Sequence, residues 1–283
     1  MPVSLPPALE LSLDLLRCPT CLTRPLHPDH GALRCPVGHT FDIARHGYAG
    51  LLTGTRATSG DDAAMVQARG RFLSTGAYAP IRQVGAHLAA DAVSERATVV
   101  DVGCGTGYYL AGVLDQLPAA RGLGLDTSVR ALRSAARAHE RAAAVAWDVF
   151  RPLPLADGVA DVVLNVFAPR NPAEFHRMLR PTGRLIVIRP TGRHLAELRG
   201  RLPAMVTIDP AKEQRLHRAL DPFFEAAVTD AVEYPATLSR RDALDLVAMT
   251  PSARHVSPAD LNDADLLPDQ VTVSVLATAY RPR

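Results

Sequence analysis

The chain has 283 residues, of which 47% are hydrophobic and 21% are charged, a composition typical of globular proteins with room for more than one domain. A formal net charge of +2 permits a nucleic-acid partner without requiring one, and the lack of an apolar run of about 18 residues argues against a transmembrane helix. The N-terminal stretch has no basic segment and is broken by prolines, so we expect no signal peptide, a cytoplasmic location and no membrane partner.

The first block of the chain, residues 1–55, has little periodicity and is too small to be held together by a hydrophobic core alone. The block contains a Cys-x₂-Cys pair followed, thirteen residues later, by a Cys-x₃-His pair. A disulfide is unusual in the cytoplasm, and a redox site of the thioredoxin type would use only the Cys-x₂-Cys pair. Three thiolates and one imidazole complete a tetrahedral zinc site and leave no position open for catalysis. We therefore predict a structural Zn²⁺ ion, with His30 as a competing ligand. The predicted ligands are Cys18, Cys21, Cys35 and His39.

Residues 56–92 are predicted to form a helical linker. The pattern over residues 61–92 predicts two helices, which the Gly-Ala-Tyr-Ala-Pro sequence at 76–80 separates.

Residues 93–283 form the third predicted domain, in which strands and helices alternate as in a mostly parallel α/β sheet. Ser128 is a candidate cap for the helix that follows the second strand. The predicted strands are 97–103, 121–128, 142–148, 159–167 and 183–190, with extended segments at 223–238 and 269–280. The predicted helices are 108–116, 171–179, 194–200 and 239–248.

The most specific motif of this domain is Val-Val-Asp-Val-Gly-Cys-Gly-Thr-Gly-Tyr-Tyr at 99–109, between a strand and a helix. It is Asp101 followed by Gly103, Gly105 and Gly107, a spacing that differs from both the dinucleotide fingerprint and the P-loop. Glycines here let the backbone approach a ligand at the carboxyl edge of the sheet. Asp126 ends the second strand, where a carboxylate can accept hydrogen bonds from both ribose hydroxyls of an adenosine moiety. Cys104 is expected to be only a small residue in this turn.

Asp148 ends the third strand and is placed to meet an adenine amino group. Together, the glycine motif and these strand-end acids resemble the class I S-adenosylmethionine-dependent methyltransferases, which implies a Rossmann-like sheet of seven strands, the last antiparallel. A nicotinamide-dinucleotide-binding domain and a ligand-free glycine turn are the alternatives. Asn165 ends the fourth strand, which in this superfamily faces the reacting methyl group. The chain has Asn-Val-Phe-Ala-Pro there, whereas amino-methylating relatives have Asn/Asp-Pro-Pro-aromatic. We therefore predict that Asn165 only orients the nucleobase that receives the methyl group.

The chain as a whole resembles the bacterial 23S rRNA guanine-N1 methyltransferases of the tylosin- and mycinamicin-resistance branch. The resemblance spans nearly all of the chain, because the zinc block is followed in order by His-Thr-Phe-Asp-Ile-Ala-Arg-His-Gly-Tyr (39–48), Ala-Met-Val-Gln-Ala-Arg-Gly-Arg-Phe-Leu (64–73) and the glycine motif. It implies that Tyr78, the Gly105-Thr106-Gly107 turn and His194 contact the cofactor. Ala77 and Gly70 depart from the family pattern, in which a histidine and a basic residue, respectively, are common.

The resemblance implies methyl transfer to N1 of a guanine in a domain II hairpin of 23S rRNA near the macrolide site of the exit tunnel, and hence macrolide resistance. A small-molecule methyltransferase of antibiotic biosynthesis and a non-catalytic RNA-binding module are the alternatives. The N-terminal block is expected to grip RNA through Arg17, Arg24, Arg34 and Arg45. Its aromatic residues Phe41 and Tyr48 either stack on bases or fill the core of the block, and for Phe41 we favour the core. A homodimer would let two such blocks frame an RNA cleft.

Overall fold

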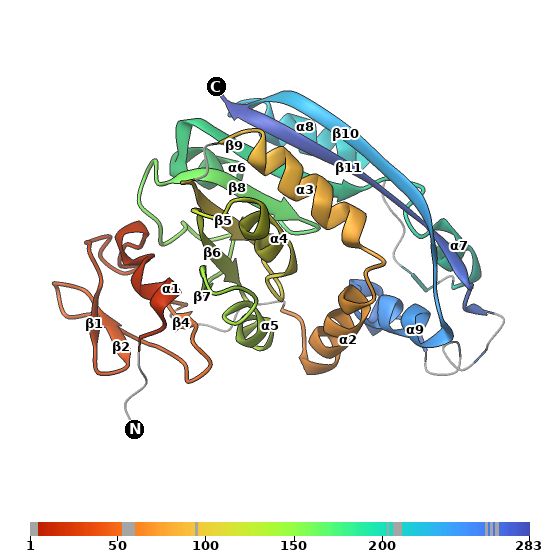
Figure 1. Ribbon diagram of the computed structural model, residues 1–283, viewed down its shortest axis with the longest axis horizontal. Coiled ribbons are helices and arrows are strands. Elements are labelled where there is room, and N and C mark those ends of the chain that lie inside the picture. Colours follow the sequence, from red (N-terminus) through yellow and green to blue (C-terminus); the bar gives the residue numbers. More distant parts are fainter. Residues whose placement is uncertain are drawn as a thin grey trace.

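The computed structural model describes residues 5–52, 60–93, 96–202, 204–205, 211–257, 260, 263 and 266–283 (Figure 1). These residues form a large mixed sheet with helices on both faces and a smaller N-terminal block, residues 5–52, beside one edge of that sheet. Within these ranges, no helix is long and apolar enough to cross a membrane.

The large sheet has eight strands in the order β10-β11-β9-β8-β5-β6-β7-β4. Neighbouring strands pair in parallel from β4 to β9, and β11 pairs antiparallel with both β9 and β10. The strands are β4 (Ala49–Gly50), β5 (Thr98–Val102), β6 (Arg121–Asp126), β7 (Ala142–Ala146), β8 (Ala160–Val166), β9 (Leu179–Pro190), β10 (Phe224–Thr237) and β11 (Gln270–Pro282). All seven predicted strands are present. The eighth, β4, is only two residues long and leaves no pattern to detect.

Parallel pairing brings the carboxyl ends of the central strands to one edge of the sheet. Asp101 of β5 lies opposite Gly124 of β6 on one side and Leu164 of β8 on the other. The glycine motif after β5, Asp126 at the end of β6 and Asn165 near the end of β8 therefore share this edge, where ligands bind in open α/β sheets.

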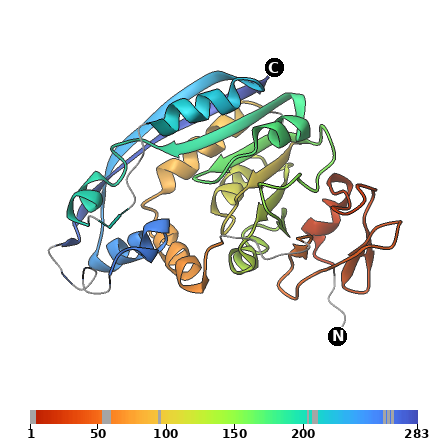
Figure 2. The ribbon, with the colours of Figure 1, turned by 180° about the vertical axis from the view of Figure 1, so that it is seen from behind.

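The sheet separates two hydrophobic cores, because consecutive residues of a strand point to opposite faces. In β5, Val99 belongs to the core under α3, α4 and α9, and Val100 belongs to the core under α6 and α8. Figure 2 shows α6 and α8 on the face opposite α3 and α4. The helices are α1 (Pro7–Glu10), α2 (Ala63–Ser74), α3 (Ala79–Ala90), α4 (Tyr108–Gln116), α5 (Val129–Ala135), α6 (Pro172–Met178), α7 (Ala196–Arg201), α8 (Ala211–Leu220) and α9 (Arg240–Ala248), with 3₁₀ turns at Leu13–Leu15 and Pro251–Arg254.

Local sequence signals account for several helix ends. The side chain of Ser128 accepts a hydrogen bond from the backbone N–H of Ala131, which confirms the predicted cap of α5. Gly76, with φ of 82°, separates α2 from α3 at the predicted break. The helix predicted over 194–200 begins only at Ala196, because Leu195 has a left-handed φ of 57° that no helical residue adopts. Helix α8 was not predicted, since its sequence is mostly polar.

The N-terminal block has its own antiparallel sheet but is also joined to the large one. Its sheet consists of β1 (His27–Asp29), β2 (Ala32–Arg34) and β3 (Thr40–Asp42). β4 then pairs with β7, and Leu16 forms a bridge with Leu155. The predicted domain boundary at residue 55 lies outside the described residues.

The glycine turn after β5 is packed against the loop that follows β8. Gly103 has φ of 84°, and a Cβ atom built on it would lie 2.4 Å from the Cβ of Ala168. Real Cβ atoms do not approach so closely, so only glycine fits this position. On the other side, the N–H groups of Gly103 and Cys104 donate to the carbonyl of Leu125. The turn is thus fixed between the ends of β6 and β8.

We expect Gly103→Ala to lower the free energy of unfolding by roughly 3 kcal/mol or more, because a left-handed alanine and a steric clash add together. The matched control is Gly158→Ala, which has φ of 60° but no atom within 4 Å of the added Cβ. It should cost only about 1 kcal/mol. Urea unfolding of both variants measures the difference, and equal losses would contradict the packing role of Gly103.

Candidate active site and metal centre

The N-terminal block brings three thiols and one imidazole together. One ligand atom from each residue lies within 4.8 Å of the others, in the set Cys18, Cys21, Cys35 and His39. Two zinc–sulfur bonds of about 2.3 Å in a tetrahedral site place the sulfurs roughly 3.8 Å apart. The Sγ atoms of Cys21 and Cys35 are 3.7 Å apart, and Nδ1 of His39 is 3.3 Å from Sγ of Cys35. The donor set and its spacing fit Zn²⁺.

The surroundings of the four ligands favour metal binding over other chemistry. Hydrogen bonds with Thr23 lower the pKa of the Cys21 thiol to about 6, which favours the thiolate that zinc requires. The side chain of His30 is 96% exposed and lies near Asp29, outside the ligand set. All four cysteines are free thiols, so the pattern is not a disulfide framework.

At the carboxyl edge of the large sheet, Asp126 is bonded to the glycine turn. Its carboxylate accepts hydrogen bonds from the backbone N–H groups of Gly105 and Ser128, each at 2.8 Å. Burial raises the pKa of Asp126 in spite of these bonds. Asp148 lies beside it, since the residue before Asp148, Trp147, donates its N–H to the carbonyl of Asp126. The two predicted cofactor acids are therefore neighbours.

Asp101 is the clearest sign that a ligand belongs at this edge. The residue is buried, and neither carboxylate oxygen has a hydrogen-bond partner. Burial, followed by the nearby charge of Asp126, raises its pKa to about 8. A buried acid without a partner is costly, and a cation next to it removes that cost. S-adenosylmethionine carries a sulfonium and an ammonium group, so the residues present fit this cofactor.

Tyr78 and His194 are 116 residues apart in sequence and meet at the same edge. The hydroxyl of Tyr78 lies 3.1 Å from Nε2 of His194, and the N–H of Ser274 in β11 donates to Nδ1 at 3.2 Å. Burial lowers the pKa of His194 to about 4, so the ring is neutral near pH 7. Because Nδ1 accepts a hydrogen bond, the ring proton is on Nε2 and is donated to Tyr78. The hydroxyl proton of Tyr78 is thus left for another acceptor.

Asn165 is fully buried, and its side-chain amide holds the loop after β8. It donates to the carbonyls of Val102 at 3.2 Å and Pro169 at 2.8 Å, while its own Oδ1 has no partner. The predicted role in orienting a base stays a prediction.

Two residues of this site had no predicted role. Arg69 of α2 is mostly buried, forms an ion pair with Asp61 and lies close to Asp126 and Gly105. The side chain of Phe167 stacks on the ring of His194. Neither position is marked by a local sequence pattern.

The arginines expected to contact RNA do not all face solvent. Arg24, Arg34 and Arg45 are exposed on the N-terminal block. The prediction for Arg17 is wrong, because its side chain turns inward to the carbonyl of Leu153 and to Asp157. Phe41 is buried in the block, as favoured from the sequence.

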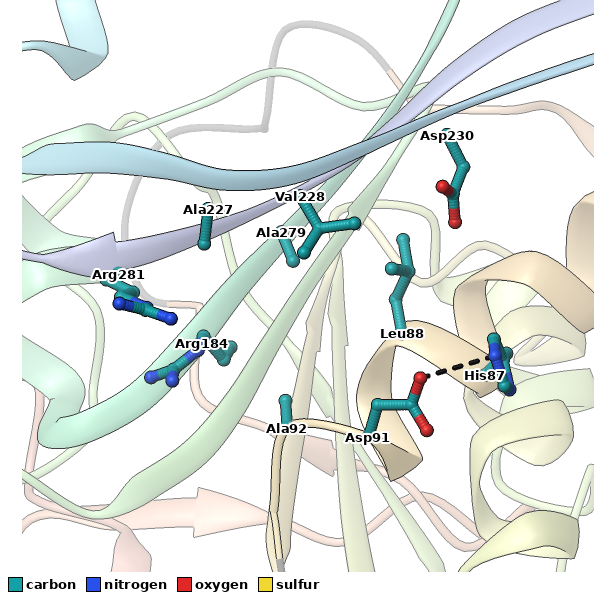
Figure 3. Close-up of a pocket in the computed structure, with 10 residues that line it drawn as sticks. All are labelled: His87, Leu88, Asp91, Ala92, Arg184, Ala227, Val228, Asp230, Ala279 and Arg281. Atoms are coloured by element: carbon teal, nitrogen blue, oxygen red, sulfur yellow. Dashed lines mark ion pairs between the residues drawn. The ribbon is translucent and has the colours of Figure 1, made fainter.

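A cavity of about 330 Å³ lies away from these groups (Figure 3). Its lining includes Arg184 and Arg281 at one end and an ion pair between His87 and Asp91 at the other. His87 and Asp91 are at the C-terminal end of α3, whereas Tyr78 precedes its N-terminus. A helix of this length separates its ends by roughly 18 Å, so the cavity is not part of the active site.

The strand order, the glycine turn and the zinc ligands define a class I S-adenosylmethionine-dependent methyltransferase with an N-terminal zinc ribbon. Residues 16–56 match the family described as "RlmA, N-terminal", and residues 99–183 match the family described as "Methyltransferase domain". The chain belongs to the family of 23S rRNA (guanine-N1)-methyltransferases.

Three relatives establish this membership. A protein of Micromonospora griseorubida that is named as a 23S rRNA (guanine-N1)-methyltransferase is 46% identical, over 95% of this chain and 98% of its own length. The 23S rRNA (guanine(748)-N1)-methyltransferase of Streptomyces fradiae is 45% identical, over 94% of this chain and 96% of its own length. A Bacillus subtilis protein named in the same way as the first is 34% identical, over 86% of this chain and 88% of its own length.

We expect Cys35→Ala to abolish binding of one zinc ion, because three ligands cannot complete the tetrahedral site. Zinc content after dialysis, measured with a colorimetric chelator, tests this. Cys104→Ala is the matched control, since that thiol lies in the glycine turn, and it should keep full zinc content. RNA methylation by Cys35→Ala should fall while S-adenosylmethionine binding persists. A full zinc content in Cys35→Ala would contradict the assigned ligand set.

The depressed pKa of His194 predicts a pH dependence of stability. The unfolded chain binds a proton on this histidine near pH 6.5 and the folded protein only near pH 4, so stability is lost as the pH falls between these values. The loss is about 3 kcal/mol at most. The free energy of unfolding of His194→Gln, measured with denaturant, should therefore change less between pH 7 and pH 4 than that of the wild type. The same change at exposed His87 should leave the wild-type slope, and equal slopes in all three proteins would exclude the buried neutral ring.

Proposed function

We propose that this protein transfers a methyl group from S-adenosylmethionine to N1 of a guanine in a 23S rRNA hairpin near the macrolide site of the exit tunnel. One observation carries the proposal. Relatives named for this reaction are 46% and 45% identical over nearly the whole chain, including both the zinc ribbon and the glycine turn. A small-molecule methyltransferase would not need the zinc ribbon. Macrolide resistance of the tylosin type follows if the modified guanine lies at the drug site.

S-adenosylmethionine supplies a methyl group that its sulfonium already makes electrophilic, so the task of the protein is positioning. We propose that Asp101 faces a cationic group of the cofactor and that Asp126 accepts hydrogen bonds from its ribose. Asp148 would bind the adenine, and the Gly103-to-Gly107 turn, including Thr106, allows close approach of the backbone. Tyr78, held by His194, would donate its remaining proton to the cofactor carboxylate. In-line placement at about 3 to 3.5 Å is worth several kcal/mol without a covalent intermediate.

In this proposal, residues 1–55 recognise RNA and residues 93–283 form the methyltransferase domain. Residues 56–92 form a helical linker that contributes to the cofactor site. The exposed Arg24, Arg34 and Arg45 are suited to phosphate contacts. Guanine N1 lies on the Watson–Crick edge, so the target must be unpaired or flipped out. A homodimer would place two such blocks around one RNA.

The test combines label transfer with reverse transcription. Purified protein is incubated with methyl-labelled S-adenosylmethionine and a domain II hairpin of 23S rRNA. We expect label in the RNA and one new reverse-transcription stop, because N1-methylguanine cannot pair. Asp126→Ala should weaken cofactor binding roughly tenfold or more, since it removes an acceptor for ribose hydroxyls. Asp115→Ala, an exposed acid on α4, is the control. Absence of label and stop with the wild-type protein would refute the proposed reaction.

A further inference from the structure

Phe167 is an aromatic residue held in a conformation that aromatic residues avoid. It follows β8, has a left-handed φ of 53° and leaves 39% of its surface exposed. Its N–H donates to the carbonyl of Ile188, while the Asn165 amide holds Pro169 and Ala168 packs over Gly103. A non-glycine residue persists in this backbone region only where its neighbours fix it, and such residues concentrate at functional sites.

The ring is supported by other aromatic groups. Its plane lies at 27° to that of His194, with the ring centres 5.8 Å apart. The rings of Tyr109 and Tyr78 have their centres at 6.4 and 6.2 Å. His194 is neutral, so the ring of Phe167 is backed by an uncharged surface while part of it faces solvent.

The position of this ring relative to the glycine turn limits which part of a bound substrate can contact it. The residue next to it, Ala168, is the one that packs on Gly103, so Phe167 lies at the carboxyl edge of the sheet where the cofactor turn begins. A flat apolar ring at such an edge offers a stacking surface for an unpaired nucleobase, which presents a π-face whatever its hydrogen-bonding edge.

We propose that Phe167 is the stacking surface for the target guanine. This inference rests on the proposed RNA methylation and adds the residue that holds the base. Asn165 acts as a positioning residue in it, because its amide fixes the loop that presents the ring.

The test uses Phe167→Gly, since glycine accepts the left-handed backbone without strain and the variant should therefore fold. Methylation of the hairpin, as kcat/KM, should fall roughly 10- to 100-fold, while calorimetric S-adenosylmethionine binding and Tm stay close to wild type. Phe167→Tyr, which keeps the ring, should retain most activity. Phe150→Gly removes another exposed ring, 69% exposed and on the turn after β7, and should leave methylation unchanged.

Each other outcome overturns the inference. Normal methylation by Phe167→Gly would show that the ring does not hold the base. A parallel loss of cofactor affinity would place the ring in the cofactor site instead. Loss of activity in Phe167→Tyr to the level of Phe167→Gly would exclude stacking as the cause. If the wild type methylates no RNA, the proposed function itself fails and the stacking inference falls with it, a result distinct from the other three.

Discussion

The close approach of Ala168 to Gly103 is the contact on which the rest of the active edge depends. It brings the end of β8 against the turn after β5, while backbone hydrogen bonds tie the same turn to β6. Asp126 can then bond to the N–H of Gly105, and the amide of Asn165 can span from Val102 to Pro169. A side chain at Gly103 would separate these elements, so the acids, the turn and the aromatic ring are positioned together by one missing Cβ.

The N-terminal block and the methyltransferase sheet share a core as well as a chain. Leu16, Leu33 and Phe41 belong to the same buried cluster as Val145 and Leu155 of the large domain. The inward-turned Arg17 adds a polar contact between the two parts. Because this packing fixes the zinc ribbon against the sheet, the exposed arginines of the ribbon keep a constant position relative to the carboxyl edge. The arrangement suits a substrate that must touch both parts at once.

Much of the fold could be predicted from the sequence, and the exceptions have a common physical cause. Buried parallel strands are apolar runs, glycines with positive φ mark the turn, and Ser128 marks a helix start, so these features are local. The two-residue β4, the inward orientation of Arg17, and the positions of Arg69 and Phe167 depend on partners far away in sequence. The zinc ligands are also distant in sequence, but they could be predicted because the spacing of cysteine and histidine residues itself indicates a shared metal ion. The burial of Asn165, by contrast, could not be read from its place at a strand end.

The pairing of β4 with β7 affects how the edge of the large sheet is exposed. β7 is Ala-Ala-Ala-Val-Ala, all buried, and without β4 it would end the sheet as an open apolar edge. Open edges of this kind invite pairing between molecules and aggregation. The two residues of β4 cover this edge where they pair with Val145 and Ala146. The block that carries the zinc ligands therefore also occupies part of the edge at which two copies of the catalytic domain could otherwise pair.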